Sequence, residues 1–99
     1  MRLTTQQTRA IKQLAVQIAG AHARVRVFGS RLDDRARGGD LDLVLELPEP
    51  VANPALLAAR LSARVSRLMH GRKVDVLLAA PNLVRLPIHD VALKEGVEL

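Results

Sequence analysis

The sequence contains no cysteine, tryptophan or tyrosine, and only one phenylalanine among 99 residues. The lack of cysteine excludes a disulfide scaffold and a thiolate zinc site. The lack of aromatic rings argues against direct nucleic-acid binding, because single strands stack their bases on such rings. No apolar run approaches the roughly 20 residues of a membrane helix, and the first residues lack a signal-peptide pattern. We therefore expect a cytoplasmic protein without a membrane segment.

Length and composition indicate a single folded domain over residues 1–99. Hydrophobic residues make up 48% of the chain, which is too many for a disordered polypeptide. A chain of this size buries roughly 60–70% of its unfolded surface, enough for one core. The net charge of +5 suits an acidic partner or phosphate groups. An arginine excess also arises in genomes rich in G and C, and composition alone does not separate these two interpretations.

The pattern of apolar residues predicts the order helix, strand, strand, helix, strand, helix. The predicted helices cover residues 4–20, 54–69 and 87–95. The predicted strands cover residues 24–28, 40–47 and 73–78. Thr4 and Gln7 predict a capping box at the first helix, and Gly20 predicts its end. This order favours an α/β (α+β) fold in which helices pack on one face of a small mixed sheet of three or four strands.

Asp40 and Asp42 form the most informative pair in the sequence. Residues i and i+2 of a strand point to the same face, with Cα atoms about 7 Å apart. Two carboxylates so close repel each other unless they are solvated or share a cation. Asp75 interrupts another apolar strand in the same way. If the two strands are neighbours, three carboxylates converge and suit Mg²⁺ or Mn²⁺; the alternative is a solvated sheet face without metal.

Gly29 and Ser30 directly follow a predicted strand. Backbone amides at such a position can bind phosphate oxygens, and glycine allows a phosphate to approach the main chain closely. The serine hydroxyl can donate a further hydrogen bond. The alternative is an ordinary turn at the end of a strand, and the Gly-Ser pair alone favours that alternative.

Together these segments resemble the signature of the DNA polymerase beta-like nucleotidyltransferase superfamily. The resemblance rests on 27–30 (VFGS), a spacer of nine residues, 40–43 (DLDL), and Asp75 within 73–76 (KVDV). The short length and the ending 88–99 are similar to the minimal nucleotidyltransferase (MNT) branch. Gly39 departs from the many relatives that have serine before the first aspartate, which removes a hydroxyl group but no metal ligand.

The resemblance implies a nucleotidyltransferase that uses Mg²⁺ (or Mn²⁺) to transfer AMP from ATP to an acceptor hydroxyl group. The implied catalytic and metal-binding residues are Asp40, Asp42 and Asp75. The implied nucleotide-binding residues are Gly29, Ser30 and Arg31. In this assignment the Gly-Ser pair binds the β- and γ-phosphates, and the arginine adds a charge-assisted contact.

The resemblance also implies a partner protein. Minimal members of the family are typically paired with an all-helical HEPN protein in modules that resemble toxin–antitoxin pairs, and some of them adenylylate that partner. A chain of this size leaves no room for a second substrate domain, so the acceptor would come from a partner or from another copy in a homo-oligomer. Two alternatives stay open: a non-catalytic antitoxin that acts by contact, and transfer to a small molecule.

Other polar residues are expected to have structural roles. The histidines show no metal-ligand spacing and are expected at the surface: His22, His70 and His89. Three arginines share one face of the second predicted helix: Arg60, Arg64 and Arg67. We expect that face to be solvated, with an acidic partner as the alternative.

Overall fold

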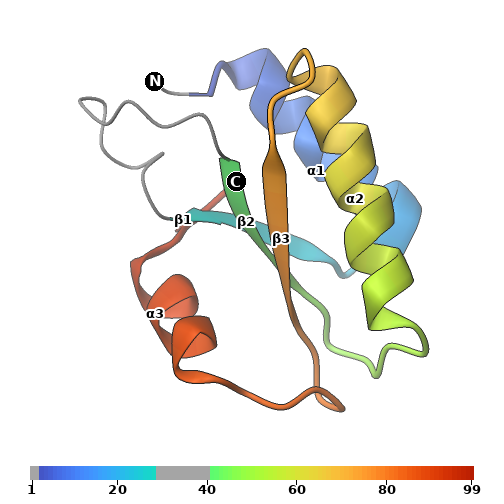
Figure 1. Ribbon diagram of the computed structural model, residues 1–99, viewed down its shortest axis with the longest axis vertical. Helices are drawn as coiled ribbons and strands as arrows, with labels where there is room; N and C mark the ends of the chain where they lie inside the picture. Colours follow the sequence, from blue (N-terminus) through green and yellow to red (C-terminus); the bar gives the residue numbers. More distant parts are fainter. Residues whose placement is uncertain (1–2, 29–40) are drawn as a thin grey trace.

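The computed structural model describes residues 3–28 and 41–99 (Figure 1). Its elements are, in chain order, α1 (Thr5–Ala19), β1 (Arg24–Phe28), β2 (Leu41–Glu46), α2 (Pro54–Leu68), β3 (Val74–Ala79), α3 (Pro87–Glu95) and β4 (Val97–Glu98). The predicted α/β fold with helices packed on a mixed sheet is confirmed. The short strand β4 was not predicted, because a strand of two residues is too short to show alternation.

The four strands form one sheet in the order β3-β2-β1-β4. β1 pairs antiparallel with both β2 and β4, whereas β2 and β3 are parallel. Parallel neighbours need a crossover connection, and α2 provides it between β2 and β3. As a consequence, the first residues of β2 and β3 lie at the same end of the sheet.

The main core lies between the sheet and the pair of helices α1 and α2. Alternate residues of β2, the three leucines Leu41, Leu43 and Leu45, are fully buried there. They pack with the apolar stripes of the two helices, which include Ile11, Ala15, Leu61 and Val65. The leucine alternation that predicted β2 therefore also sets which face of the strand meets the helices.

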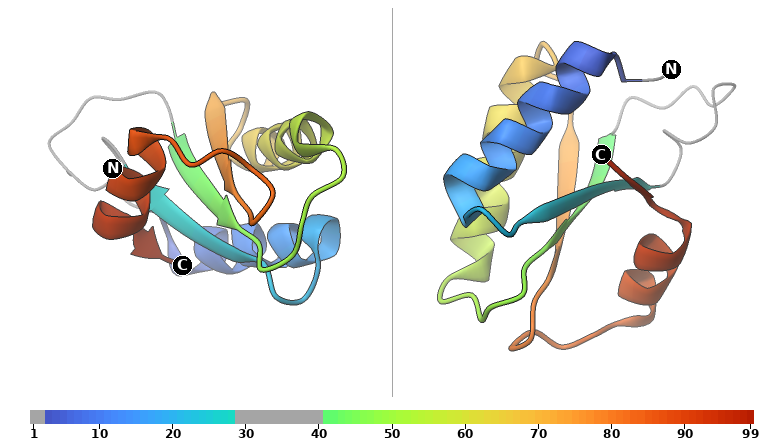
Figure 2. Two further views of the ribbon diagram at one scale, coloured as in Figure 1. Left: turned by 90° about the horizontal axis from the view of Figure 1, so that it is seen from below. Right: turned by 180° about the vertical axis from the view of Figure 1, so that it is seen from behind.

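Helix α3 lies on the opposite side of the sheet from α1 and α2 (Figure 2) and contacts β1 and β2. The prediction that the helices pack on one face of the sheet is therefore wrong for α3. Val44 explains this position, since it alternates with the core leucines and so points to the other face. Val44 is 0% exposed, as is Ala92 of α3. Val44 thus places one apolar side chain among the polar residues on the outer face of β2, and α3 covers it.

Local signals define the helix ends. The predicted capping box is present: the Gln7 backbone N–H donates to Thr4 Oγ1 at 3.0 Å, and the Thr4 backbone N–H donates to Gln7 Oε1 at 2.9 Å. Asn53 caps α2, whose first residue is Pro54. Within the described part of the chain, no helix is both long and apolar enough to cross a membrane.

Candidate carboxylate site

Asp42 and Asp75 occupy paired positions on the two parallel strands β2 and β3. Both residues alternate with side chains of the main core, so both lie on the outer face of the sheet, away from α1 and α2. Phe28 pairs with Asp42 from the other side. Neighbouring strands are about 4.8 Å apart. The fold therefore brings together two of the three carboxylates that the sequence singled out.

Two serines of α2 fix the segment that leads into Asp75. Ser62 Oγ donates to the carbonyl oxygen of Val74, and Ser66 Oγ donates to that of Arg72, each at 2.6 Å. On the opposite side, the backbone N–H of Leu41 donates to the carbonyl oxygen of Lys73 at 2.9 Å. The start of β3 is thus held from both sides. Sequence reasoning missed these serines, although their spacing of four residues beside an apolar stripe was a usable signal.

The remaining predicted site residues lie outside the described residues. They are Gly29, Ser30, Arg31 and Asp40. Within the residues that the structure does describe, no group of three or more histidine, cysteine, aspartate or glutamate side chains could hold a metal ion. The described part of the candidate site therefore consists of the Asp42–Asp75 pair.

The donor chemistry of this pair fits magnesium. Asp42 is half-buried and Asp75 is exposed, so ligand oxygens at this place remain in contact with water. Magnesium usually keeps several water ligands and is held by one or two carboxylates together with substrate phosphates. Like charges at paired positions destabilise a sheet, and a shared cation removes that repulsion. Asp42 and Asp75 would thus hold the ion, with substrate and water completing its coordination.

Glu46, a third carboxylate of the outer face, is engaged elsewhere. Arg26 Nε donates to Glu46 Oε1 at 2.8 Å, and Arg26 Nη2 lies 3.5 Å from Glu98 Oε1. The hydrogen bond to Glu46 raises the pKa of Arg26 above its usual value, so this guanidinium stays charged at any physiological pH. Glu46 also lies at the far end of β2 from Asp42. The Arg26–Glu46 ion pair therefore lies at the opposite end of the outer face from Asp42 and Asp75.

His89 corrects the expectation that all three histidines lie at the surface. His22 and His70 are exposed, but His89 is only 6% exposed. Its Nδ1 accepts from the backbone N–H of Leu86 at 2.9 Å, and its Nε2 lies 2.8 Å from the carbonyl oxygen of Leu78. A ring nitrogen that accepts from an N–H carries no proton, so the imidazole is neutral and donates from Nε2. His89 is a structural residue with both nitrogens occupied.

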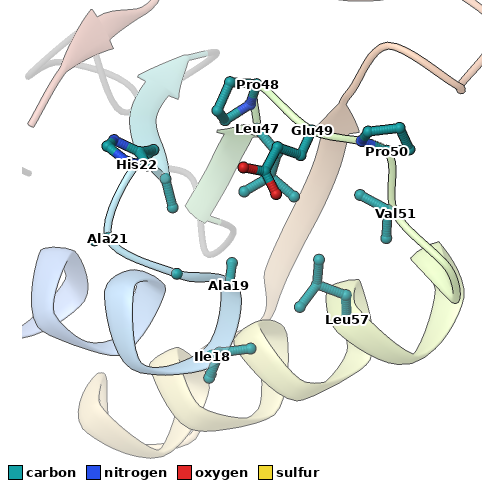
Figure 3. A pocket seen from close by; sticks show the side chains of 12 residues that line it. Ile18, Ala19, Ala21, His22, Leu47, Pro48, Glu49, Pro50, Val51 and Leu57 are labelled. Carbon is teal, nitrogen blue, oxygen red and sulfur yellow. The ribbon is translucent and has the colours of Figure 1, made fainter.

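A hollow of about 380 Å³ lies where α1 and β2 end and α2 begins (Figure 3). Its walls are mostly apolar, and its titratable side chains are His22 and Glu49. The hollow includes Leu47, which follows the last residue of β2, whereas Asp42 is near the first. It is therefore separated from the carboxylate pair by the length of the strand.

Comparison of the chain with protein-family models, with curated proteins and with solved structures gives no match.

The first prediction concerns the repulsion between the paired carboxylates. We expect Asp75→Asn to raise the free energy of unfolding in metal-free buffer by up to about 1 kcal/mol, because it removes one of two like charges at paired positions. Urea unfolding with a chelator present measures the free energy of unfolding of the variant and the wild type. Excess Mg²⁺ should reduce the difference between them. The matched control is Asp90→Asn, which removes a carboxylate that is 2.8 Å from Arg85 Nε and should not stabilise the protein. Destabilisation by Asp75→Asn in chelator would contradict the prediction.

Proposed function

We propose that the chain is a Mg²⁺-dependent nucleotidyltransferase that transfers AMP from ATP to a hydroxyl group of a partner protein. The observation that carries the proposal is the strand register, which pairs Asp42 with Asp75 on the outer face. Asp40 precedes Asp42 by two residues in the sequence. Carboxylates gathered at one end of a sheet suit metal-assisted displacement at phosphorus. The proposal places the chain in the MNT branch that its sequence resembles.

In this proposal each carboxylate has a defined task. Asp40, Asp42 and Asp75 hold the metal, which when bound would neutralise charge on the phosphates of ATP. The acceptor oxygen forms a bond to the α-phosphorus, the bond from that phosphorus to the bridging oxygen breaks, and pyrophosphate leaves. Asp75 accepts the proton of the acceptor hydroxyl. Its exposure supports this role, because a hydroxyl on another macromolecule has to reach it.

Chain connectivity supports the proposed phosphate-binding residues. Phe28 is the last residue of β1 and pairs with Asp42. Gly29 is the next residue in the chain, and consecutive Cα atoms are about 3.8 Å apart. In this proposal Gly29, Ser30 and Arg31, which follow Phe28 in the sequence, bind the β- and γ-phosphates, while the α-phosphate faces Asp42 and Asp75.

The proposed acceptor is carried by a HEPN-type helical protein, with this chain as the antitoxin of the pair. The alternative, neutralisation of the partner by contact alone, requires neither the carboxylates nor ATP. The two are separated by incubating both proteins with Mg²⁺ and ATP labelled at the α-phosphate. Label that stays on the partner after denaturation supports transfer, and its absence while the partner is still neutralised supports contact alone.

The second prediction concerns binding of metal and nucleotide. Titration calorimetry should detect Mn²⁺ with ATP binding to the chain much more tightly than Mn²⁺ alone, because phosphate oxygens complete the coordination sphere. Asp42→Asn should weaken binding of Mn²⁺ with ATP at least tenfold, equivalent to about 1.4 kcal/mol. Glu49→Gln is the control, since it removes one exposed carboxylate at the other end of the sheet. If Asp42→Asn binds as tightly as the wild type, the site is misplaced.

A further inference from the structure

Helices α1 and α2 carry positive charge and contain no acidic residue. We call their exposed cations the basic face: Arg9, Lys12, Arg60, Arg64 and Arg67. Among the described residues, every acidic side chain lies outside the two helices: Asp42, Glu46, Glu49, Asp75, Asp90, Glu95 and Glu98. A genome rich in G and C would raise the arginine content, but it does not account for the absence of acidic residues from both helices while the rest of the chain contains them.

The fold gathers these cations in one part of the helical layer. Arg60, Arg64 and Arg67 are four and three residues apart, so they share one side of α2 over about 10 Å of its axis. The two helices lie side by side on the sheet and run in opposite directions (Figure 1). Arg9, early in α1, is therefore at the same end of the layer as Arg64 and Arg67, late in α2.

The basic face lacks counter-charges from within the chain. The ion pairs found among the described residues involve Arg26 and Arg85 and none of the five cations of the face. Like charges four residues apart on a helix, such as Arg60 and Arg64, repel each other. A ligand with several negative charges would remove that repulsion, so charge complementarity indicates a polyanion.

The neutral residues beside the cations of α1 are hydrogen-bond donors. Thr5, Gln6 and Gln13 are exposed, and they line an open hollow together with Arg9 and Lys12. Arginine, lysine, threonine and glutamine are among the residue types whose side chains contact phosphate oxygens in protein–DNA complexes. The surface therefore offers the donors that a phosphate backbone uses.

An acidic protein fits this surface less well. A protein–protein interface usually has an apolar core from which charged residues are depleted. The large exposed hydrophobic residues of the layer, Val16 and Leu56, lie beyond the cations towards its other end, since Val16 is late in α1 and Leu56 early in α2. The cations thus surround no large apolar residue, and the observations favour phosphate groups.

We propose that the basic face binds the phosphate backbone of a double-stranded nucleic acid without reading its sequence. Single strands are bound by stacking their bases on aromatic rings, and the one aromatic residue of the chain, Phe28, pairs with Asp42 on the other face of the sheet. A duplex carries one negative charge per about 1.7 Å of its axis, and contact with its phosphates needs no aromatic ring. Because the basic face lies across the sheet from the carboxylates, the proposal does not depend on nucleotidyl transfer.

The third prediction is salt-dependent binding of a duplex by the full chain. Fluorescence anisotropy with a labelled DNA duplex of about 20 base pairs should give a dissociation constant on the order of 10–100 µM at about 150 mM NaCl, within the range of non-specific binding. The logarithm of the association constant should fall with the logarithm of the salt concentration with a slope of about −4 to −5, because each of five phosphate contacts contributes about −0.9. The same titration with an RNA duplex shows which kind of duplex binds more tightly.

Two triple variants with the same net charge locate the contact. The test variant replaces the three arginines of α2: Arg60→Gln, Arg64→Gln and Arg67→Gln. The control variant replaces three exposed cations outside the layer: Arg24→Gln, Arg85→Gln and Lys94→Gln. The test variant should bind the duplex at least tenfold more weakly and reduce the slope by about 3, whereas the control variant should change the slope by less than about 1. Circular dichroism checks that both variants keep their fold.

Several results would overturn the proposal. Equal losses in the two triple variants would show that net charge alone attracts the duplex. A wild type that binds no duplex even at about 50 mM NaCl would show that the basic face is only solvated. A single strand of the same sequence that binds more tightly than the duplex would contradict the backbone contact. A polyglutamate peptide of equal charge that competes as well as the unlabelled duplex would assign the face to an acidic protein.

Discussion

A double substitution Asp42→Asn, Asp75→Asn should reduce AMP transfer to the partner at least about a thousandfold, which corresponds to about 4 kcal/mol of lost transition-state stabilisation. The amides keep the size of the side chains but remove the negative charge that would hold the metal. They also remove the carboxylate that accepts the proton of the acceptor hydroxyl. Because the two residues are proposed to act as one unit, each single substitution should cost nearly as much as the pair.

The measurement is the rate at which label from the α-phosphate of ATP appears on the helical partner. Glu49→Gln controls for the loss of one exposed carboxylate and should transfer at the wild-type rate. The isolated chain should transfer little AMP, since an exposed site neither excludes water nor orients an acceptor, and positioning supplies much of the rate. Wild-type transfer by the double variant would contradict the assignment of the carboxylates. A variant Asp40→Ala, Asp42→Ala that still neutralises the partner would favour the contact-only alternative.

The sequence was sufficient to predict the faces of β2, because the leucines Leu41, Leu43 and Leu45 occupy every second position there. It was not sufficient to predict that Asp42 pairs with Asp75. That pairing depends on the parallel direction of β3 and on its register, and α2 and its two serine hydrogen bonds help to hold both. A slip of one residue would turn one carboxylate toward the core. Such long-range register is set by packing between elements, which local periodicity does not encode.

The position of α3 shows a second limit. A helix of nine residues has an apolar pattern too short to reveal which face of a sheet it covers. The usable signal for the position of α3 was in β2. Val44 stands on the outer face of this strand, where the neighbouring positions are polar, and it is fully buried. The burial of His89 had no local signal, since its partner Leu78 belongs to β3 and is 11 residues earlier.

His89 also protects the edge of β3, which is the outermost strand of the sheet among the described residues. The carbonyl oxygens of Lys73 and Ala79 accept hydrogen bonds from β2-side residues Leu41 and Leu47. Successive carbonyl groups of a strand alternate in direction, so those of Val74 and Leu78 face the free edge of β3. Ser62 donates to the first of these and His89 to the second. Side chains from α2 and α3 thus occupy groups with which an additional strand would pair.

His89 therefore holds the start of α3 through Leu86 and covers the edge of β3 through Leu78, and its substitution should affect both. His89→Ala should lower the free energy of unfolding by about 2–4 kcal/mol, because the N–H of Leu86 and the carbonyl of Leu78 both lose a buried partner. His89→Gln should lose less of the free energy of unfolding, since its amide can still donate toward Leu78. The control His22→Ala should change stability by no more than about 0.5 kcal/mol, because His22 is exposed. Urea unfolding provides these values, and light scattering should show that only His89→Ala aggregates through the uncovered edge. Equal stability of His89→Ala and His22→Ala would show that the imidazole holds neither α3 nor the edge.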